Sequence, residues 1–97
     1  MEVREYENLV IITPEIPEDE IDKKIEDITS VIKQCGGQDI TVEKWGMRTF
    51  AYPIKKKDRG FYVLFTHKCT PKGVNMLQKA LKSKDYILRF NCIKKEA

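Results

Sequence analysis

Four isoleucines recur at steps of four and three residues between positions 21 and 32, and strand-like segments flank them on both sides. Residues at this spacing lie on one face of a helix, and Cys35 continues the same face. Pro17 and the acidic residues 18–20 suit a first helical turn, because acids complement the positive end of the helix dipole. Gly36 and Gly37 can adopt the left-handed conformation that often ends a helix. The pattern therefore predicts an amphipathic helix that opens within residues 16–20 and ends at the two glycines.

Four segments are predicted to be strands, because β-branched and aromatic residues are frequent in them and alternate with polar ones. They span residues 3–12, about 39–54, 61–68 and 85–94. A shorter second helix is expected to begin at Pro71 and to turn its apolar residues inward, namely Val74, Leu77 and Leu81.

The order of elements is therefore strand, helix, strand, strand, helix, strand. Right-handed crossovers place both helices on one face of a four-stranded antiparallel sheet. The sequence thus predicts an α+β, ferredoxin-like β-α-β-β-α-β sandwich, formed as a single domain by residues 1–97. Apolar residues occupy both faces of the first, third and fourth strands, so the open face is expected to be partly apolar, as partner-binding faces are.

The long second strand carries two residues that restrict its position. Gly46 lies in its middle and predicts a bulge or a sharp bend. Pro53 has no N–H to donate, which predicts that this strand lies at an edge of the sheet. A turn at residues 55–60 then leads into the third strand.

Charge is distributed unevenly along the chain, although the net charge is only +3. Residues 1–47 hold five basic and twelve acidic residues, a net −7, and residues 48–97 hold thirteen and three, a net +10. A basic surface of this kind favours a polyanionic partner. The alternative is that the two halves interleave in space and cancel each other.

Several other functions are disfavoured by composition. The acidic N-terminus lacks the features of a signal peptide, and no apolar run approaches the length of a membrane span, so we expect a cytoplasmic protein without a membrane partner. Cys35, Cys69 and Cys92 are widely spaced and the sole histidine is His67. We therefore expect reduced structural thiols, no metal site and no cofactor, with His67 at a strand end or on the surface.

No catalytic set is present, so we expect neither an enzyme nor a small-molecule substrate. Small phosphatases with this fold grip phosphate through a glycine-rich, cationic loop after the first strand. The corresponding residues 13–18 are acidic and contain no glycine, so they would repel a phosphate.

RNA is the remaining candidate partner. Residues 59–65 resemble the third-strand octapeptide of an RNA-recognition motif, but Tyr62 stands where that motif has a small residue and Val63 where it has an aromatic one. Base stacking on the sheet is therefore not expected. Electrostatic binding to folded RNA is expected instead, through basic residues of the strands and of one turn, namely Arg48, Arg89, Lys55, Lys56, Lys57 and Arg59. The alternatives are that the lysines only solubilise the turn and that Arg89 pairs with Asp85 or with acids of the first strand.

The segment Gly46-Met47-Arg48-Thr49-Phe50-Ala51-Tyr52-Pro53-Ile54-Lys55-Lys56 resembles the signature of the bacterial small-subunit ribosomal protein six family. Further likeness lies in Arg4-Glu5-Tyr6-Glu7, in Gly60-Phe61-Tyr62 and in residues 84–90, and it covers nearly the whole chain in order. Two positions depart from the family pattern: Thr49 replaces a longer polar or charged residue, and Phe50 replaces leucine. Thr49 weakens the case for an RNA contact at that position.

The resemblance implies a structural component of the 30S subunit with the ferredoxin-like sandwich. It further implies binding to the central domain of 16S ribosomal RNA as a heterodimer with ribosomal protein eighteen. Carried over by position, the RNA-facing residues are expected to be Arg4, Tyr6, Arg89 and Lys94, with Arg48 and the turn 55–59 as weaker candidates. The alternative is a non-ribosomal ferredoxin-like domain that binds RNA or serves as a regulatory interaction module.

Overall fold

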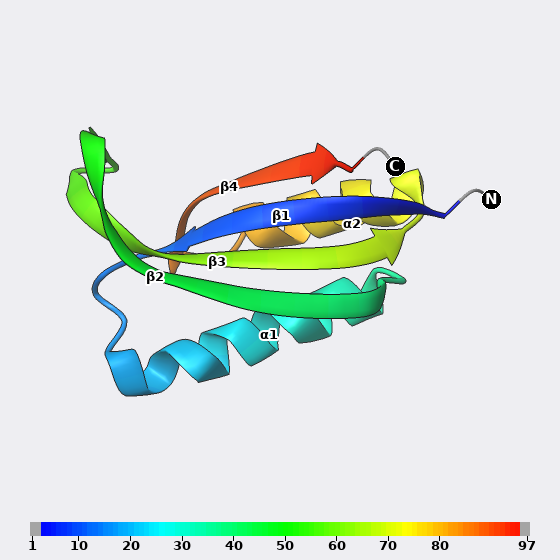
Figure 1. The fold of residues 1–97 in the computed structure, drawn as a ribbon, viewed down its shortest axis with the longest axis horizontal. Helices are drawn as coiled ribbons and strands as arrows, with labels where there is room; N and C mark the ends of the chain where they lie inside the picture. Colours follow the sequence, from blue (N-terminus) through cyan, green and yellow to red (C-terminus); the bar gives the residue numbers. More distant parts are fainter. Residues whose placement is uncertain (1–2, 96–97) are drawn as a thin grey trace.

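The regular elements follow one another in the predicted order in the computed structural model, which describes residues 3–95 (Figure 1). They are β1 (Arg4–Ile12), α1 (Ile21–Gln34), β2 (Gln38–Ile54), β3 (Lys57–Cys69), α2 (Pro71–Lys82) and β4 (Ile87–Lys94). A short 3-10 helix, η1 (Glu18–Glu20), precedes α1.

The four strands form one antiparallel sheet in the order β2-β3-β1-β4. Figure 1 shows α2 behind the sheet and α1 along its lower side, partly behind β2. The buried residues of both helices join one core with the same face of the sheet, so the face toward the viewer is open. This arrangement confirms the predicted ferredoxin-like sandwich and the predicted edge position of β2, the strand that contains Pro53.

The core lies between the helices and the covered face of the sheet. The four isoleucines of α1 are all buried, as are Leu77 and Leu81 of α2. They pack against alternate residues of the two central strands, Val10 and Ile12 from β1 and Val63 and Phe65 from β3. Burying each such side chain contributes about 1.5–3 kcal/mol, so this layer accounts for most of the hydrophobic stabilisation.

Glycines form the end of α1 and the bulge in β2 that the sequence predicts. Gly36 has a φ of 90° just beyond α1, and the N–H of Gly37 donates to the carbonyl of Ile32 at 2.8 Å, which closes the helix end. Gly46 has a φ of 91° and lies where the β2–β3 register shifts, so the predicted bulge is confirmed.

Several element boundaries differ from the sequence-based expectation, and β4 begins at Ile87 rather than at residue 85. The structure begins β3 at Lys57 rather than at residue 61, because Ile54 pairs with Lys57 across a two-residue turn. The turn residues Lys55 and Lys56 have φ values of 48° and 66°, as a type I′ turn requires. The first helix also starts later than expected: Pro17 caps η1, and α1 begins at Ile21.

His67 was expected at a strand end or on the surface, and the surface placement is wrong. It is 1% exposed within β3, and its Nε2 lies 2.6 Å from Nδ2 of Asn8, which is also buried. Because His67 points to the covered face beside Asn8 and Phe65, the helical layer shields it. Its burial lowers the pKa of the imidazole.

Within residues 3–95, no helix has the length and apolar character needed to cross a membrane. Among the same residues, no group of three histidine, cysteine or acidic side chains could hold a metal ion. The three cysteines are free thiols, and burial raises the pKa of Cys35 and Cys92.

Candidate nucleic-acid interface

The β2–β3 hairpin curls at the end of the sheet that lies farthest from the termini (Figure 1). The curl is held by Phe50, whose ring centroid lies 6.1 Å from that of Tyr62. Gly60 makes room for it, since a Cβ there would lie 2.5 Å from Cγ2 of Ile11 and 2.9 Å from Cζ of Phe50. Phe50, the departure from the family pattern, therefore packs against the body of the sheet.

A shallow hollow lies between the curled hairpin and the open face. Its volume is about 290 Å³, and it is lined by Thr49, Phe50, Ala51, Tyr52, Pro53, Ile54, Tyr62 and Arg89. The exposed Arg89 belongs to β4 at the opposite edge of the sheet and is level with Ile11 of β1. The hairpin and β4 thus approach the same surface from two sides.

Several predicted RNA-binding residues are exposed at this hairpin end. Arg48 stacks over the Trp45 ring, with its guanidinium carbon 5.5 Å from the ring centroid. Lys55 and Lys56 form the turn, and Arg59 follows in β3. The fold therefore gathers Arg48, the turn lysines, Arg59 and Arg89 at one end of the molecule.

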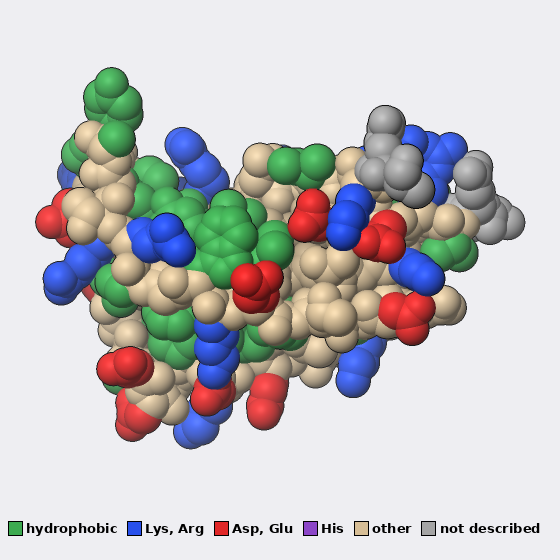
Figure 2. Space-filling view, viewed as in Figure 1, with side chains coloured by type: hydrophobic (Ala, Val, Ile, Leu, Met, Phe, Trp, Pro, Cys, Tyr) green, Lys and Arg blue, Asp and Glu red, His purple; other side chains and the backbone are tan. Residues whose placement is uncertain are grey.

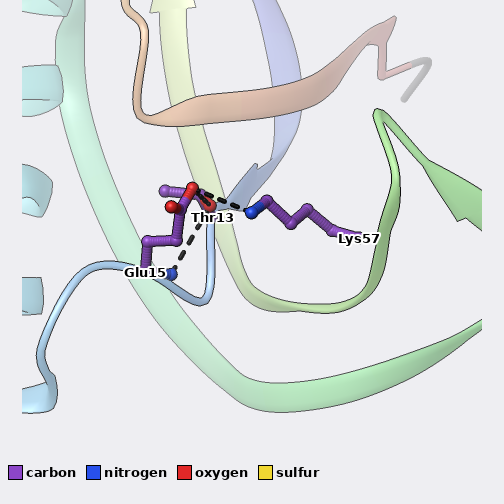
Figure 3. A network of polar contacts seen from close by, with 3 residues as sticks. All are labelled: Thr13, Glu15 and Lys57. Atoms are coloured by element: carbon purple, nitrogen blue, oxygen red, sulfur yellow. Dashed lines mark hydrogen bonds and ion pairs between the residues drawn. The ribbon is translucent and has the colours of Figure 1, made fainter.

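Lys57 differs from its neighbours because it has an acidic partner within the chain. Its Nζ lies 3.1 Å from Oε1 of Glu15, and Thr13 Oγ1 donates to the same carboxylate at 3.3 Å (Figure 3). The hydrogen bond from Lys57 is the main reason that the pKa of Glu15 is lowered. This contact ties the hairpin to the loop after β1, so Lys57 has a structural role whether or not it also contacts RNA.

The remaining predicted residues lie at the other end of the sheet, near the termini. Lys94 is exposed on β4, and Arg4 is half-buried on β1. Tyr6 is only 7% exposed, and its ring stacks on His67 with the ring centroids 6.1 Å apart. The RNA contact expected of Tyr6 stays a prediction, and packing in the interior is the role that the structure assigns to its ring.

The candidate residues therefore form two groups rather than one. We call Arg48, Lys55, Lys56, Lys57, Arg59 and Arg89 the hairpin group, and Arg4, Tyr6 and Lys94 the terminal group. Arg59 and His67 are eight residues apart on β3. His67 pairs with Tyr6 of β1, and Tyr6 pairs with Lys94 of β4, so His67 marks the level of Lys94 on β3. At 3.3 Å per residue Arg59 lies about 26 Å from the level of Lys94, whereas Arg89, five residues from Lys94 on β4, lies about 16 Å from it.

The acidic and basic halves of the sequence partly interleave in space. Four ion pairs among the described residues join an acid of residues 1–47 to a lysine of residues 48–97: Glu5–Lys95, Glu15–Lys57, Asp27–Lys84 and Asp39–Lys68. The charge asymmetry of the sequence is therefore smaller on the surface. Surface pairs of this kind contribute at most about 1 kcal/mol each, so their main effect is on the surface charge.

The open face is partly apolar, as predicted. Leu9 and Leu64 are half-buried there, and Ile93 is 54% exposed. Figure 2 shows apolar side chains gathered over the half of the sheet next to the hairpin, with charged side chains around them. Tyr52, at 82% exposure the most exposed large apolar residue described, was noted from the sequence only as part of the hairpin motif and was not among the predicted RNA-binding residues, because the curl that exposes it depends on tertiary contacts.

Comparisons with known proteins agree with one another. The model of the family described as ribosomal protein S6 matches residues 5–94. The small ribosomal subunit protein bS6 of Heliobacterium modesticaldum is 33% identical over 97% of this chain and 98% of its own length. The bS6 protein of Clostridium novyi is 34% identical over 97% and 99%. The crystal structure of 30S ribosomal protein S6 from Thermotoga maritima superposes with a TM-score of 0.90 at 31% identity, over 97% of this chain and 89% of that one.

Proposed function

This chain belongs to the ribosomal protein S6 family, and we propose that it binds the central domain of 16S ribosomal RNA as a heterodimer with ribosomal protein eighteen. Family membership makes it a structural, non-enzymatic constituent of the small ribosomal subunit, associated with ribosomal RNA in the cytoplasm. The proposal concerns the RNA region, the partner and the residues that contact each of them.

The observation that carries the proposal is the open sheet face with its arginines. Arg48 and Arg89 are exposed on strands β2 and β4, on either side of a partly apolar surface. Arginine suits phosphate because its planar fork makes two parallel hydrogen bonds. An exposed apolar surface of this kind suits a protein partner. The two chemistries side by side fit a protein that holds RNA and a second protein together.

The pairing alternative for Arg89 has no support from the structure. Arg89 is exposed, and the ion pairs described for β4 and its neighbours involve Lys95 with Glu5 and Lys84 with Asp27. Its guanidinium is therefore accessible to a phosphate. We propose Arg89 as the central RNA contact of the hairpin group.

Binding to RNA is expected to depend steeply on salt. A transcript of the 16S central domain, titrated with the chain and saturating ribosomal protein eighteen, should show a linear fall of log affinity with log salt concentration. The slope should be about −0.7 to −0.9 for each phosphate that is neutralised. Affinity that does not change between 50 and 200 mM salt would exclude the phosphate contacts. A transcript of another 16S domain serves as the control for specificity.

Binding to ribosomal protein eighteen is expected to use the apolar open face. Replacing Ile93, which is half exposed there, by lysine should weaken the heterodimer about tenfold, because the partner would bury a charge. Met76→Lys is the matched control, since Met76 is similarly exposed but lies on α2, on the other side of the sheet. Calorimetric titration measures both affinities. Equal losses for the two variants would place the partner elsewhere.

A further inference from the structure

A second depression lies outside the hollow described above, along the free edge of β4 where α2 packs beneath it. Its volume is about 400 Å³. It is lined by Lys55, Gln78, Leu81, Lys82, Ile87, Leu88, Arg89, Phe90, Asn91 and Cys92. We call it the α2–β4 groove.

Three cations converge on the α2–β4 groove from separate parts of the chain. Lys55 comes from the β2–β3 turn, Lys82 is the last residue of α2, and Arg89 belongs to β4. All three are exposed. Two amide side chains, Gln78 and Asn91, add hydrogen-bond donors. All ten lining residues belong to the described part of the chain, and none of them is acidic.

A simpler explanation exists for Lys82. A lysine in the last turn of a helix complements the negative end of the helix dipole, and α2 has two such residues, Lys79 and Lys82. Lys79 is also exposed, yet it does not line the groove. Both lysines therefore interact favourably with the helix dipole, but only Lys82 lines the groove. Lys79 is thus the matched control for Lys82.

We propose that the α2–β4 groove holds a single-stranded stretch of ribosomal RNA backbone, with Lys82 as a phosphate contact in addition to Lys55 and Arg89. The proposal rests on the proposed function, because it extends the same RNA surface around the edge of the sheet. Positive grooves that follow the backbone are the usual way to hold a single strand. Arg89 lines both the hollow on the open face and this groove, so the two surfaces are continuous.

The test compares Lys82→Ala with Lys79→Ala. Each variant, with saturating ribosomal protein eighteen, is titrated against the 16S central-domain transcript between 50 and 200 mM salt. Lys82→Ala should flatten the log–log slope by about 0.7 to 0.9, the share of one phosphate. Over this fourfold change in salt, the affinity advantage of the wild type over Lys82→Ala should therefore shrink about threefold. Lys79→Ala should keep the wild-type slope, and Lys82→Arg should restore it.

The outcomes separate this inference from the function on which it rests. If the wild type binds with a steep salt slope but Lys82→Ala behaves like Lys79→Ala, the groove carries no RNA and the inference is overturned. An acidic peptide as the true occupant would give this same result. If the wild type itself shows no salt-dependent binding, the proposed function fails first. Urea unfolding of both alanine variants controls for the helix, since each loses the same interaction with the dipole.

Discussion

His67 illustrates how a single residue takes its chemistry from its neighbours. It faces the covered side of β3, stacked on Tyr6 and in contact with Asn8. The unfolded chain exposes the imidazole to water, where its pKa is near 6.5, whereas burial lowers the pKa in the folded protein. The unfolded state therefore binds a proton more readily than the folded state as the pH falls.

This difference predicts a loss of stability in mild acid. A group whose folded pKa is depressed supports the fold fully above its unfolded pKa, so the loss should begin as the pH falls below about 6.5. At pH 5.5 it can reach about 1.4 kcal/mol. Urea unfolding at pH 7.5 and 5.5 measures it. His67→Gln keeps a polar partner for Asn8 but cannot titrate, so its stability should change less between the two pH values. An equal change in both proteins would assign the effect to other groups.

At the scale of elements, the β2–β3 hairpin combines a tight turn with residues that do not favour it. Type I′ turns need positive φ at both central positions, where asparagine and glycine are preferred. Here the positions hold Lys55 and Lys56, and each left-handed residue with a side chain costs about 1–2 kcal/mol. Local strain of this kind often marks a functional site. We therefore expect Lys55 and Lys56 to contribute to RNA binding rather than to the stability of the turn.

Replacing Lys55-Lys56 by Asn-Gly tests whether the two lysines lower the stability of the turn and raise the affinity for RNA. The double variant should gain about 1–2 kcal/mol of stability, because glycine at the second position adopts positive φ freely, whereas asparagine at the first keeps part of the cost. The double variant should also bind the central-domain RNA more weakly and with a flatter salt slope, since two cations are lost. Thermal unfolding and RNA titration measure the two effects. Unchanged RNA affinity would show that the two lysines only solubilise the turn.

At the scale of the whole molecule, the sheet separates the two groups of basic residues. Arg59 lies about 26 Å from the level of Lys94 along β3. Even the nearest members of the hairpin group and the terminal group, Arg89 and Lys94, lie about 16 Å apart on β4, or about two Debye lengths at physiological salt. They cannot share one phosphate. If both groups contact RNA, they contact different segments of it, and the protein spans the distance between those segments.

This separation predicts that variants at the two ends act independently. Arg59→Ala from the hairpin group and Lys94→Ala from the terminal group should each weaken RNA binding. Their effects on the binding free energy should add within about 0.5 kcal/mol in the double variant, as for sites that share no partner. The matched combination Lys55→Ala with Arg89→Ala, from one group, should deviate from additivity. Strong coupling between Arg59 and Lys94 would mean that both ends hold one rigid RNA element.

The sequence by itself determined the order of strands and helices, the inward faces of the helices, the edge position of β2 and the family. These follow from local periodicity, from Gly46 and Pro53, and from a motif that is contiguous in the chain. Only the tertiary structure decided that His67 is buried, that Lys57 binds Glu15 and that Lys55, Lys82 and Arg89 surround one groove. Those facts depend on strand register and on the packing of layers, which join residues far apart in the chain and leave no periodic trace in it.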